Sequence, residues 1–156
     1  MVRSRSRWSP SRLSGLGDVL LRVGVAAALL VSAVIHLRLA DDYNLAFPGG
    51  LGGGTIFRLE AVAALAALVL VLWWGGVRGH LPALVVLAGA FAAVVLYRFV
   101  PVPAIGPVPS MYEPVWYAEK TISAVVAGAG AVLAAIGMTM AVRRGARPAS
   151  QLNHDI

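Results

Sequence analysis

The chain has no cysteine among its 156 residues. This absence excludes disulfides, thiol redox chemistry, thiolate metal sites and iron–sulfur ligation. The chain therefore cannot be one of the four-helix membrane enzymes that transfer disulfides, since these need cysteines. Charge is also scarce: charged residues make up 13% of the sequence, and only 7 residues are acidic. The mean hydropathy of +0.80 lies far outside the range of a soluble domain, so the composition indicates an integral membrane protein.

Four long apolar runs are present, over about residues 16–39, 55–76, 82–100 and 116–142. Each has about 20 residues or more, enough at about 1.5 Å per residue to cross a hydrocarbon core about 30 Å thick. Backbone groups in lipid must be satisfied within the chain, which favours helices. We therefore predict an all-α fold, a transmembrane four-helix bundle over residues 16–142, with a disordered basic tail over 1–15 and a second tail over 143–156.

The first run follows a basic segment, a pattern that signal peptides share. The run is longer than the 7 to 15 residues of a typical signal-peptide core, and no clean small-x-small cleavage site precedes Asp41. We interpret it as a retained span. The glycine-rich stretch 49–54 lacks the Lys-Ser/Thr of a phosphate-binding loop and precedes another span, so we interpret it as a linker.

The basic residues are distributed unevenly between the two sides of the predicted bundle. Nine fall on the side of both chain ends and four on the other: Arg3, Arg5, Arg7, Arg12, Arg22, Arg78, Arg143, Arg144 and Arg147, against Arg38, Arg58, Arg98 and Lys120. The positive-inside rule then predicts a multi-pass protein of the cell membrane with both termini cytoplasmic. The same rule explains the net charge of +6, and no basic surface interleaved with aromatics is present, so we expect no nucleic-acid partner.

One connecting segment, residues 101–120, carries five of the nine prolines. Proline fixes its own φ and disfavours a helical conformation in the preceding residue, so this segment is expected to be stiff and non-helical until about Pro114. It presents Met111, Tyr112, Glu113 and Trp116 between two spans. The aromatic residues among them suit either a ligand platform or a belt at the membrane interface.

Polar residues gather at the outer ends of all four spans. Ionisable groups inside a membrane cost about 2 to 3 kcal/mol at its centre, so they normally face the bundle and pair. We expect His36, Glu60 and Glu119 to face one another across an outward-opening cavity capped by the 101–115 loop, with Arg58 and Arg98 as counter-charges. The candidate ligand-binding residues are His36, Arg58, Glu60, Tyr97, Arg98, Met111, Tyr112, Glu113, Trp116 and Glu119.

The alternative is structural: such pairs can fix helix order and register, while Arg38 and Lys120 extend to water. Tyr43 and Phe47 are interpreted as interfacial anchors, and His80 as an incidental residue of a cytoplasmic turn. In the fourth span, Ser123, Ala127, Ala131 and Ala135 repeat every four residues and predict a face that packs closely on another helix.

These residues do not indicate a particular chemical reaction. No serine stands in a nucleophile elbow, and His36, Glu60 and Glu119 lack the spacing that typically selects a metal. Catalytic residues are therefore not assigned. A non-enzymatic subunit or binding protein is our first hypothesis, a quinone- or metal-linked redox component the second, and a small transporter subunit the third. Beyond the lipid bilayer, a membrane-protein partner or a homo-oligomer are the expected partners.

Three motifs carry a resemblance to a known group: His36-Leu37 with Tyr43, Tyr97-Arg98, and the segment Ile105-Gly-Pro-Val-Pro-Ser-Met-Tyr-Glu-Pro-Val-Trp116. Together they resemble small four-span membrane proteins of actinobacteria that are loosely similar to DoxX-type proteins. The resemblance covers about residues 17–142. It implies a quinone-linked or redox-partner role and assigns no catalytic residue.

Overall fold

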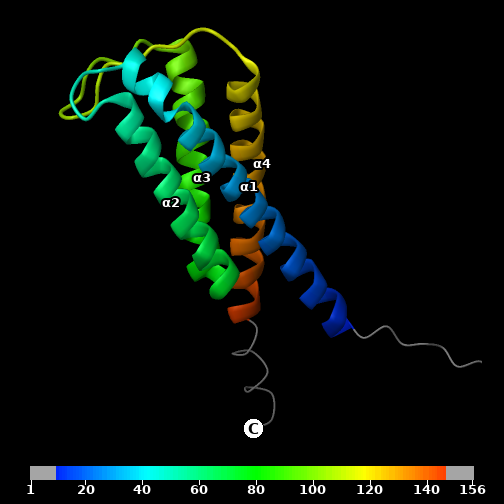
Figure 1. The fold of residues 1–156 in the computed structure, drawn as a ribbon. Helices are drawn as coiled ribbons and strands as arrows, with labels where there is room; N and C mark the ends of the chain where they lie inside the picture. Colours follow the sequence, from blue (N-terminus) through cyan, green and yellow to red (C-terminus); the bar gives the residue numbers. More distant parts are fainter. Residues whose placement is uncertain (1–9, 147–156) are drawn as a thin grey trace, which may run out of the picture.

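The structure, a computed structural model, describes residues 10–146, and these form four helices joined by two short connections and one longer one, residues 100–117 (Figure 1). The helices are α1 (Pro10–Ala46), α2 (Gly53–Trp73), α3 (Gly76–Phe99) and α4 (Ala118–Gly145). All four are long and apolar enough to span a membrane. The prediction of an all-α bundle of four apolar helices is therefore confirmed.

The helix ends differ from the predicted spans. Helix α1 begins at Pro10, inside the segment assigned to the N-terminal tail, and proline at a first helical position costs no hydrogen bond. It also continues past residue 39 to Ala46, through the polar residues Asp41 and Asp42. Helix α4 begins later than predicted, at Ala118. Residues 1–9 and 147–156 of the predicted tails lie outside the described residues.

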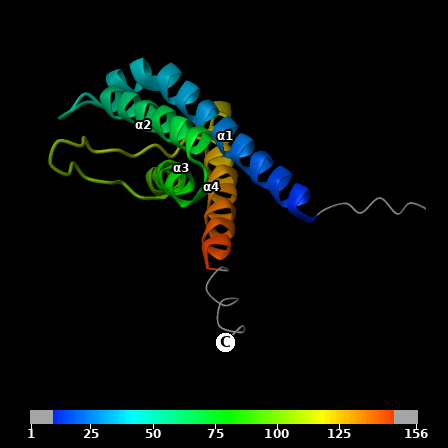
Figure 2. The same cartoon turned by 90° about the horizontal axis from the view of Figure 1, so that it is seen from below.

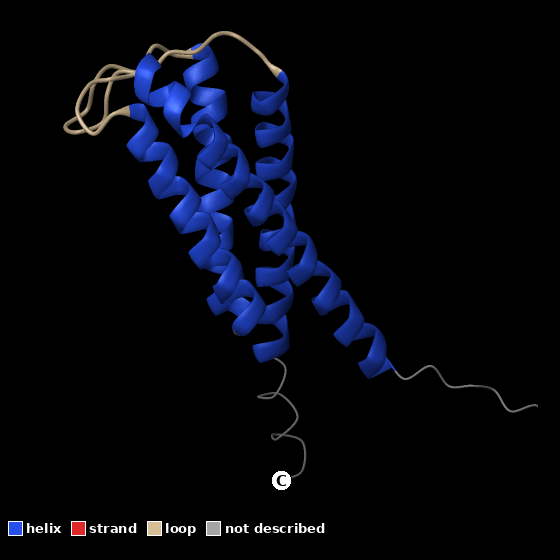
Figure 3. Ribbon diagram, in the orientation of Figure 1, coloured by secondary structure: helices blue, strands red, loops and turns tan. Residues whose placement is uncertain are grey.

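Neighbours in sequence are neighbours in space. Helix α1 packs on α2, α2 on α3 and α3 on α4, and α4 closes the ring on α1, as Figure 2 shows from below. Pro10 and Gly145 consequently lie at one end of the bundle, here named the termini end. The connections 47–52 and 100–117 lie at the opposite end, the loop end (Figure 3).

Helix α4 packs through a seam of small residues. Its buried positions include Lys120, Ser123, Ala127, Gly130, Ala134 and Gly137, which alternate spacings of three and four. Such spacing keeps one face toward its neighbours, whereas a strict four-residue repeat drifts around a helix of 3.6 residues per turn. The predicted stripe is therefore right for Ser123 and Ala127, which are buried. Ala131 is partly buried and packs against the core, and Ala135 is partly buried.

The middle of the bundle is apolar and closely packed. Leu29, Leu87, Val25 and Val71 are fully buried there, together with alanines from all four helices. Gly130 permits close approach, because a Cβ atom at that position would lie 2.6 Å from the Cβ of Ala28. Large apolar side chains on the outside of the bundle, such as Leu20, Val62, Val85 and Val125, are exposed, as is typical of a lipid-facing surface.

Two polar residues at the termini end have structural partners. The Nε–H of Arg22 donates to the carbonyl of Val71 at 2.9 Å, and its Nη2 donates to the carbonyl of Leu72. Arg22 thus satisfies carbonyls that the end of α2 leaves free. His80, interpreted from the sequence as incidental, is fully buried against Gly137, and its Nδ1 lies 2.7 Å from the carbonyl oxygen of Gly76.

At the loop end, residues 102–111 form a short hairpin with bridges between Val102 and Met111 and between Ile105 and Val108. The hairpin is bound to the α1–α2 connection by the N–H of Leu51, which donates to the carbonyl of Pro107 at 2.8 Å. Gly50 makes this approach possible: its φ is +58°, and a Cβ atom there would lie 2.2 Å from the Pro107 oxygen. The two connections therefore form one unit above the bundle.

Candidate functional site

A cavity of about 160 Å³ lies at the loop end, with walls from all four helices and from the 101–117 segment. Aliphatic and aromatic side chains form most of its surface, including Ile35, Phe57 and Met111. Its polar wall residues are His36, Tyr43, Glu60, Tyr97, Glu113, Tyr117, Lys120 and Ser123. A mostly apolar pocket with a few convergent polar groups is typical of a small-molecule site.

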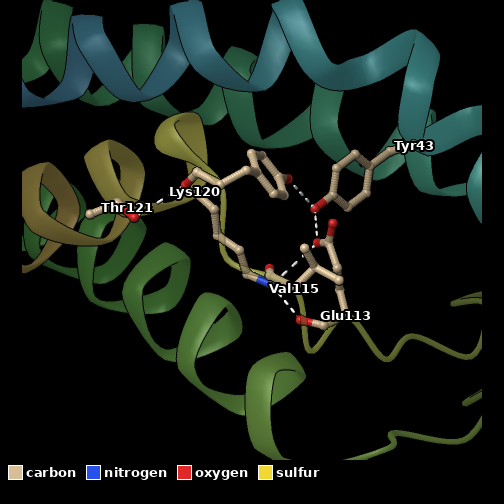
Figure 4. A network of polar contacts seen from close by, with 6 residues as sticks. Tyr43, Glu113, Val115, Lys120 and Thr121 are labelled. Carbon is tan, nitrogen blue, oxygen red and sulfur yellow. Dashed lines mark hydrogen bonds and ion pairs between the residues drawn. The ribbon is translucent and has the colours of Figure 1, made fainter.

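One side of the cavity is a hydrogen-bonded network centred on Glu113 (Figure 4). The hydroxyl of Tyr43 in α1 donates to the Glu113 carboxylate, and the hydroxyl oxygens of Tyr43 and Tyr117 lie 2.8 Å apart. Because Tyr43 has already used its one proton, the Tyr117 hydroxyl is the donor to Tyr43. Burial, the main cause, raises the pKa of Tyr117 above its ordinary value, so this donor keeps its proton at neutral pH.

Lys120 completes the network. Its side chain is only 4% exposed, and its ammonium group lies 3.4 Å from the Glu113 carboxylate. It also donates to the backbone carbonyls of Glu113 and Val115, and it lies 5.6 Å from the centre of the Trp116 ring. The expectation that Lys120 extends to water is therefore wrong. Its three donors are directed at the loop, which it binds to the start of α4.

His36 and Glu60 also line the cavity but take no part in this network. The Nδ1 of His36 lies 2.8 Å from the carbonyl oxygen of Ser32, so Nδ1–H donates; when the ring is neutral, its Nε2 is an acceptor. The His36 ring lies 5.0 Å from that of Phe57, which in turn stacks on Tyr43 at 3.9 Å. The Oε1 atom of Glu60 is buried and has no hydrogen-bond partner among the residues that the structure describes.

The structure brings together half of the predicted site residues. His36, Glu60, Tyr97, Met111 and Glu113 line the cavity. The others do not: Arg58, Arg98, Tyr112, Trp116 and Glu119. Of the two expected counter-charges, Arg58 pairs with Asp41 at 2.6 Å in an exposed position, and Arg98 lies over the Phe99 ring at 5.2 Å.

Glu119 is exposed, and the prediction that it faces Glu60 and His36 is wrong. The reason is the phase of α4: the buried seam passes through Ser123 and Lys120, three residues apart, and leaves Glu119 beside it. His36, Glu60 and Glu119 are therefore not brought together. Within residues 10–146 no group of three or more histidines and carboxylates is placed to hold a metal ion.

Sequence reasoning missed Tyr43, Tyr117, Lys120 and Ser123 as cavity residues. Two signals were present. Tyr43 follows His36 by two helical turns and so falls on the same face of α1, and Lys120 precedes Ser123 by three residues on the small-residue face of α4. For Tyr117 we find no comparable sequence signal.

Comparison with known proteins identified no family: no family model, no curated protein and no solved structure matches the chain. The resemblance to actinobacterial four-span proteins of DoxX type therefore stays a prediction. What the fold establishes is a small protein of four packed helices, each long and apolar enough to cross a membrane.

Proposed function

We propose that this protein is a non-enzymatic membrane protein that binds a small molecule in the cavity at the loop end. The observation that carries the proposal is the convergence of all four helices and the 101–117 segment on one mostly apolar cavity that contains His36 and Glu60. Neither residue has a salt-bridge partner among the described residues. Ionisable groups inside a membrane protein mark functional sites more often than structural ones.

The size of the cavity limits the ligand. Its volume of about 160 Å³ is close to that of an engineered protein cavity of about 150 Å³ that binds benzene. The ligand, or the part of it that enters, is therefore about the size of one six-membered ring with a small substituent. The positive-inside rule predicts that the loop end lies outside the cell, so we propose that the ligand arrives from the exterior.

Filling the cavity tests the proposal. Ala93→Leu adds bulk to the cavity wall, whereas Ala92→Leu adds the same bulk on the exposed side of α3. We expect native mass spectrometry of gently extracted protein to show a bound small molecule in the unaltered chain and in Ala92→Leu, and its loss in Ala93→Leu. An unaltered protein that carries no small molecule, or equal occupancy in all three proteins, would contradict the proposal.

A quinone-linked redox component is the second candidate. The observation that favours it is that two residues with acceptor atoms, His36 and Glu60, line the same cavity as the stacked rings of Phe57 and Tyr43. The two hydroxyls of a hydroquinone head group would donate to such acceptors, and its isoprenoid tail would leave toward the lipid. A stoichiometric quinone in the mass spectrum would establish this candidate in place of a non-redox ligand.

A further inference from the structure

The cavity contains two carboxylates with different surroundings. Glu113 has an ammonium group 3.4 Å away and accepts a hydrogen bond from Tyr43, so its charge is balanced within the protein. Glu60 has neither: its Oε1 is buried without a hydrogen-bond partner in the described part of the chain, and no described cation lies within 4.0 Å of its carboxylate. A buried carboxylate oxygen without a partner is costly, and a ligand that pairs with the carboxylate can offset this cost.

The nearby hydrogen-bond donors have other partners. Lys120 binds Glu113 and the loop carbonyls. Arg58, only two residues from Glu60, instead pairs with Asp41 on the exposed side of α2. The Nδ1–H of His36 is used by the carbonyl of Ser32. Glu60 is thus an acceptor in the cavity wall, and none of these three donors pairs with it.

Aromatic rings surround the same space. Phe57 precedes Glu60 by three residues on α2 and also lines the cavity, where it stacks on Tyr43. Phe47, Tyr97 and Tyr117 contribute to the walls as well. The face of an aromatic ring attracts a cation, most strongly in a desolvated site, and cages of such rings typically recognise quaternary ammonium groups.

We infer that the ligand is a small organic ammonium cation, whose charged group pairs with the Glu60 carboxylate among the rings of Phe57, Tyr43 and Tyr97. This inference rests on the proposed function, since it names the class of ligand for the same cavity. It differs from the quinone candidate in the charge of the ligand. A hydroquinone is neutral and would leave the carboxylate without a counter-charge.

Two probes of the same shape distinguish the effect of the ligand's charge on affinity from the effect of its shape. Choline carries a trimethylammonium group, and 3,3-dimethylbutan-1-ol replaces its nitrogen by carbon and is neutral. Isothermal titration of the full chain in lipid nanodiscs measures the affinity of each. We expect choline to bind at least about tenfold more tightly than the neutral probe. Glu60→Gln should remove this preference, and Asp42→Asn, which alters an exposed carboxylate of α1, should leave it unchanged.

The possible outcomes are distinct. Equal binding of both probes, or choline binding that Glu60→Gln does not weaken, overturns the inference while the cavity remains a ligand site. Absence of binding by either probe, with an empty cavity in the mass spectrum of the unaltered protein, overturns both the inference and the proposed function. The comparison of the two probes uses the unaltered chain, so it remains decisive even where Glu60→Gln fails to fold.

Discussion

At the scale of single residues, the charged residues near the ends of the helices form either exposed or buried ion pairs. Their positions in the sequence do not show which. Arg58 and Asp41 form a short ion pair, but their side chains are 50% and 88% exposed. Lys120 and Glu113 lie farther apart, but both are largely buried and share a network with two tyrosines. Desolvation makes the second pair far more sensitive to the loss of one partner.

We predict that Lys120→Met lowers the free energy of unfolding by about 3 to 5 kcal/mol, because it leaves the largely buried Glu113 carboxylate without its counter-charge and two backbone carbonyls without their donor. Arg58→Met is the matched control and should cost about 1 kcal/mol or less. Denaturant titration in detergent micelles, followed by tryptophan fluorescence, measures both. Similar losses for the two variants would show that Lys120 is not the stabilising partner of the loop.

The site could be predicted from the sequence only in part. His36 and Glu60 were found because they interrupt apolar helical faces, a pattern that one helix displays by itself. The choice between Glu119 and Lys120 depended on the phase of the buried seam of α4, because the two residues lie four and three positions before Ser123 and both spacings bring a side chain near it. The contact of Tyr43 with Glu113 joins residues 70 positions apart and arises only from packing.

At the scale of elements, the two connections at the loop end act together because a backbone hydrogen bond joins Leu51 to Pro107. The residues that follow the hairpin are also bound to α3, since the N–H of Glu113 donates to the carbonyl of Tyr97 at 2.9 Å. The roof of the cavity is thus held by backbone groups on one side and by Lys120 on the other.

We predict that Gly50→Ala separates the hairpin from the α1–α2 connection, since its Cβ would lie 2.2 Å from the Pro107 oxygen. Gly76→Ala is the matched control: its φ of +53° carries a similar backbone cost of about 1 to 2 kcal/mol, but nothing lies within 4 Å of its Cβ. Hydrogen exchange should accelerate at Leu51 and across 102–111 in Gly50→Ala only. Unchanged protection there would argue against the close approach.

The helices themselves were largely predictable, because a run of about 20 apolar residues has one stable solution in lipid. Their ends were not. Asp41 and Asp42 read as the end of a span, yet α1 continues because Asp41 pairs with Arg58 and Tyr43 reaches the polar network. Hydropathy reports where the membrane environment ends, whereas a helix ends where its backbone hydrogen bonds stop.

At the scale of the whole molecule, the orientation in the membrane remains a prediction from the distribution of arginines. The chain has no cysteine, so a single introduced thiol reports its own side of the membrane. We expect Ser110→Cys in intact cells to react with a membrane-impermeant maleimide, and Ala146→Cys to react only after lysis; both positions are exposed. The reverse pattern of labelling would invert the topology.

The apolar middle of the bundle determines from which side of the membrane a ligand could enter and leave the cavity. Leu29, Leu87, Val25 and Val71 fill the space toward the termini end without exposure to solvent, so the cavity has a closed floor. As long as this packing persists, a ligand bound there would exchange only with the compartment or leaflet at the loop end. Occupancy would then report concentration on one face of the membrane, as a receptor does, while the barrier to ions and metabolites stays intact.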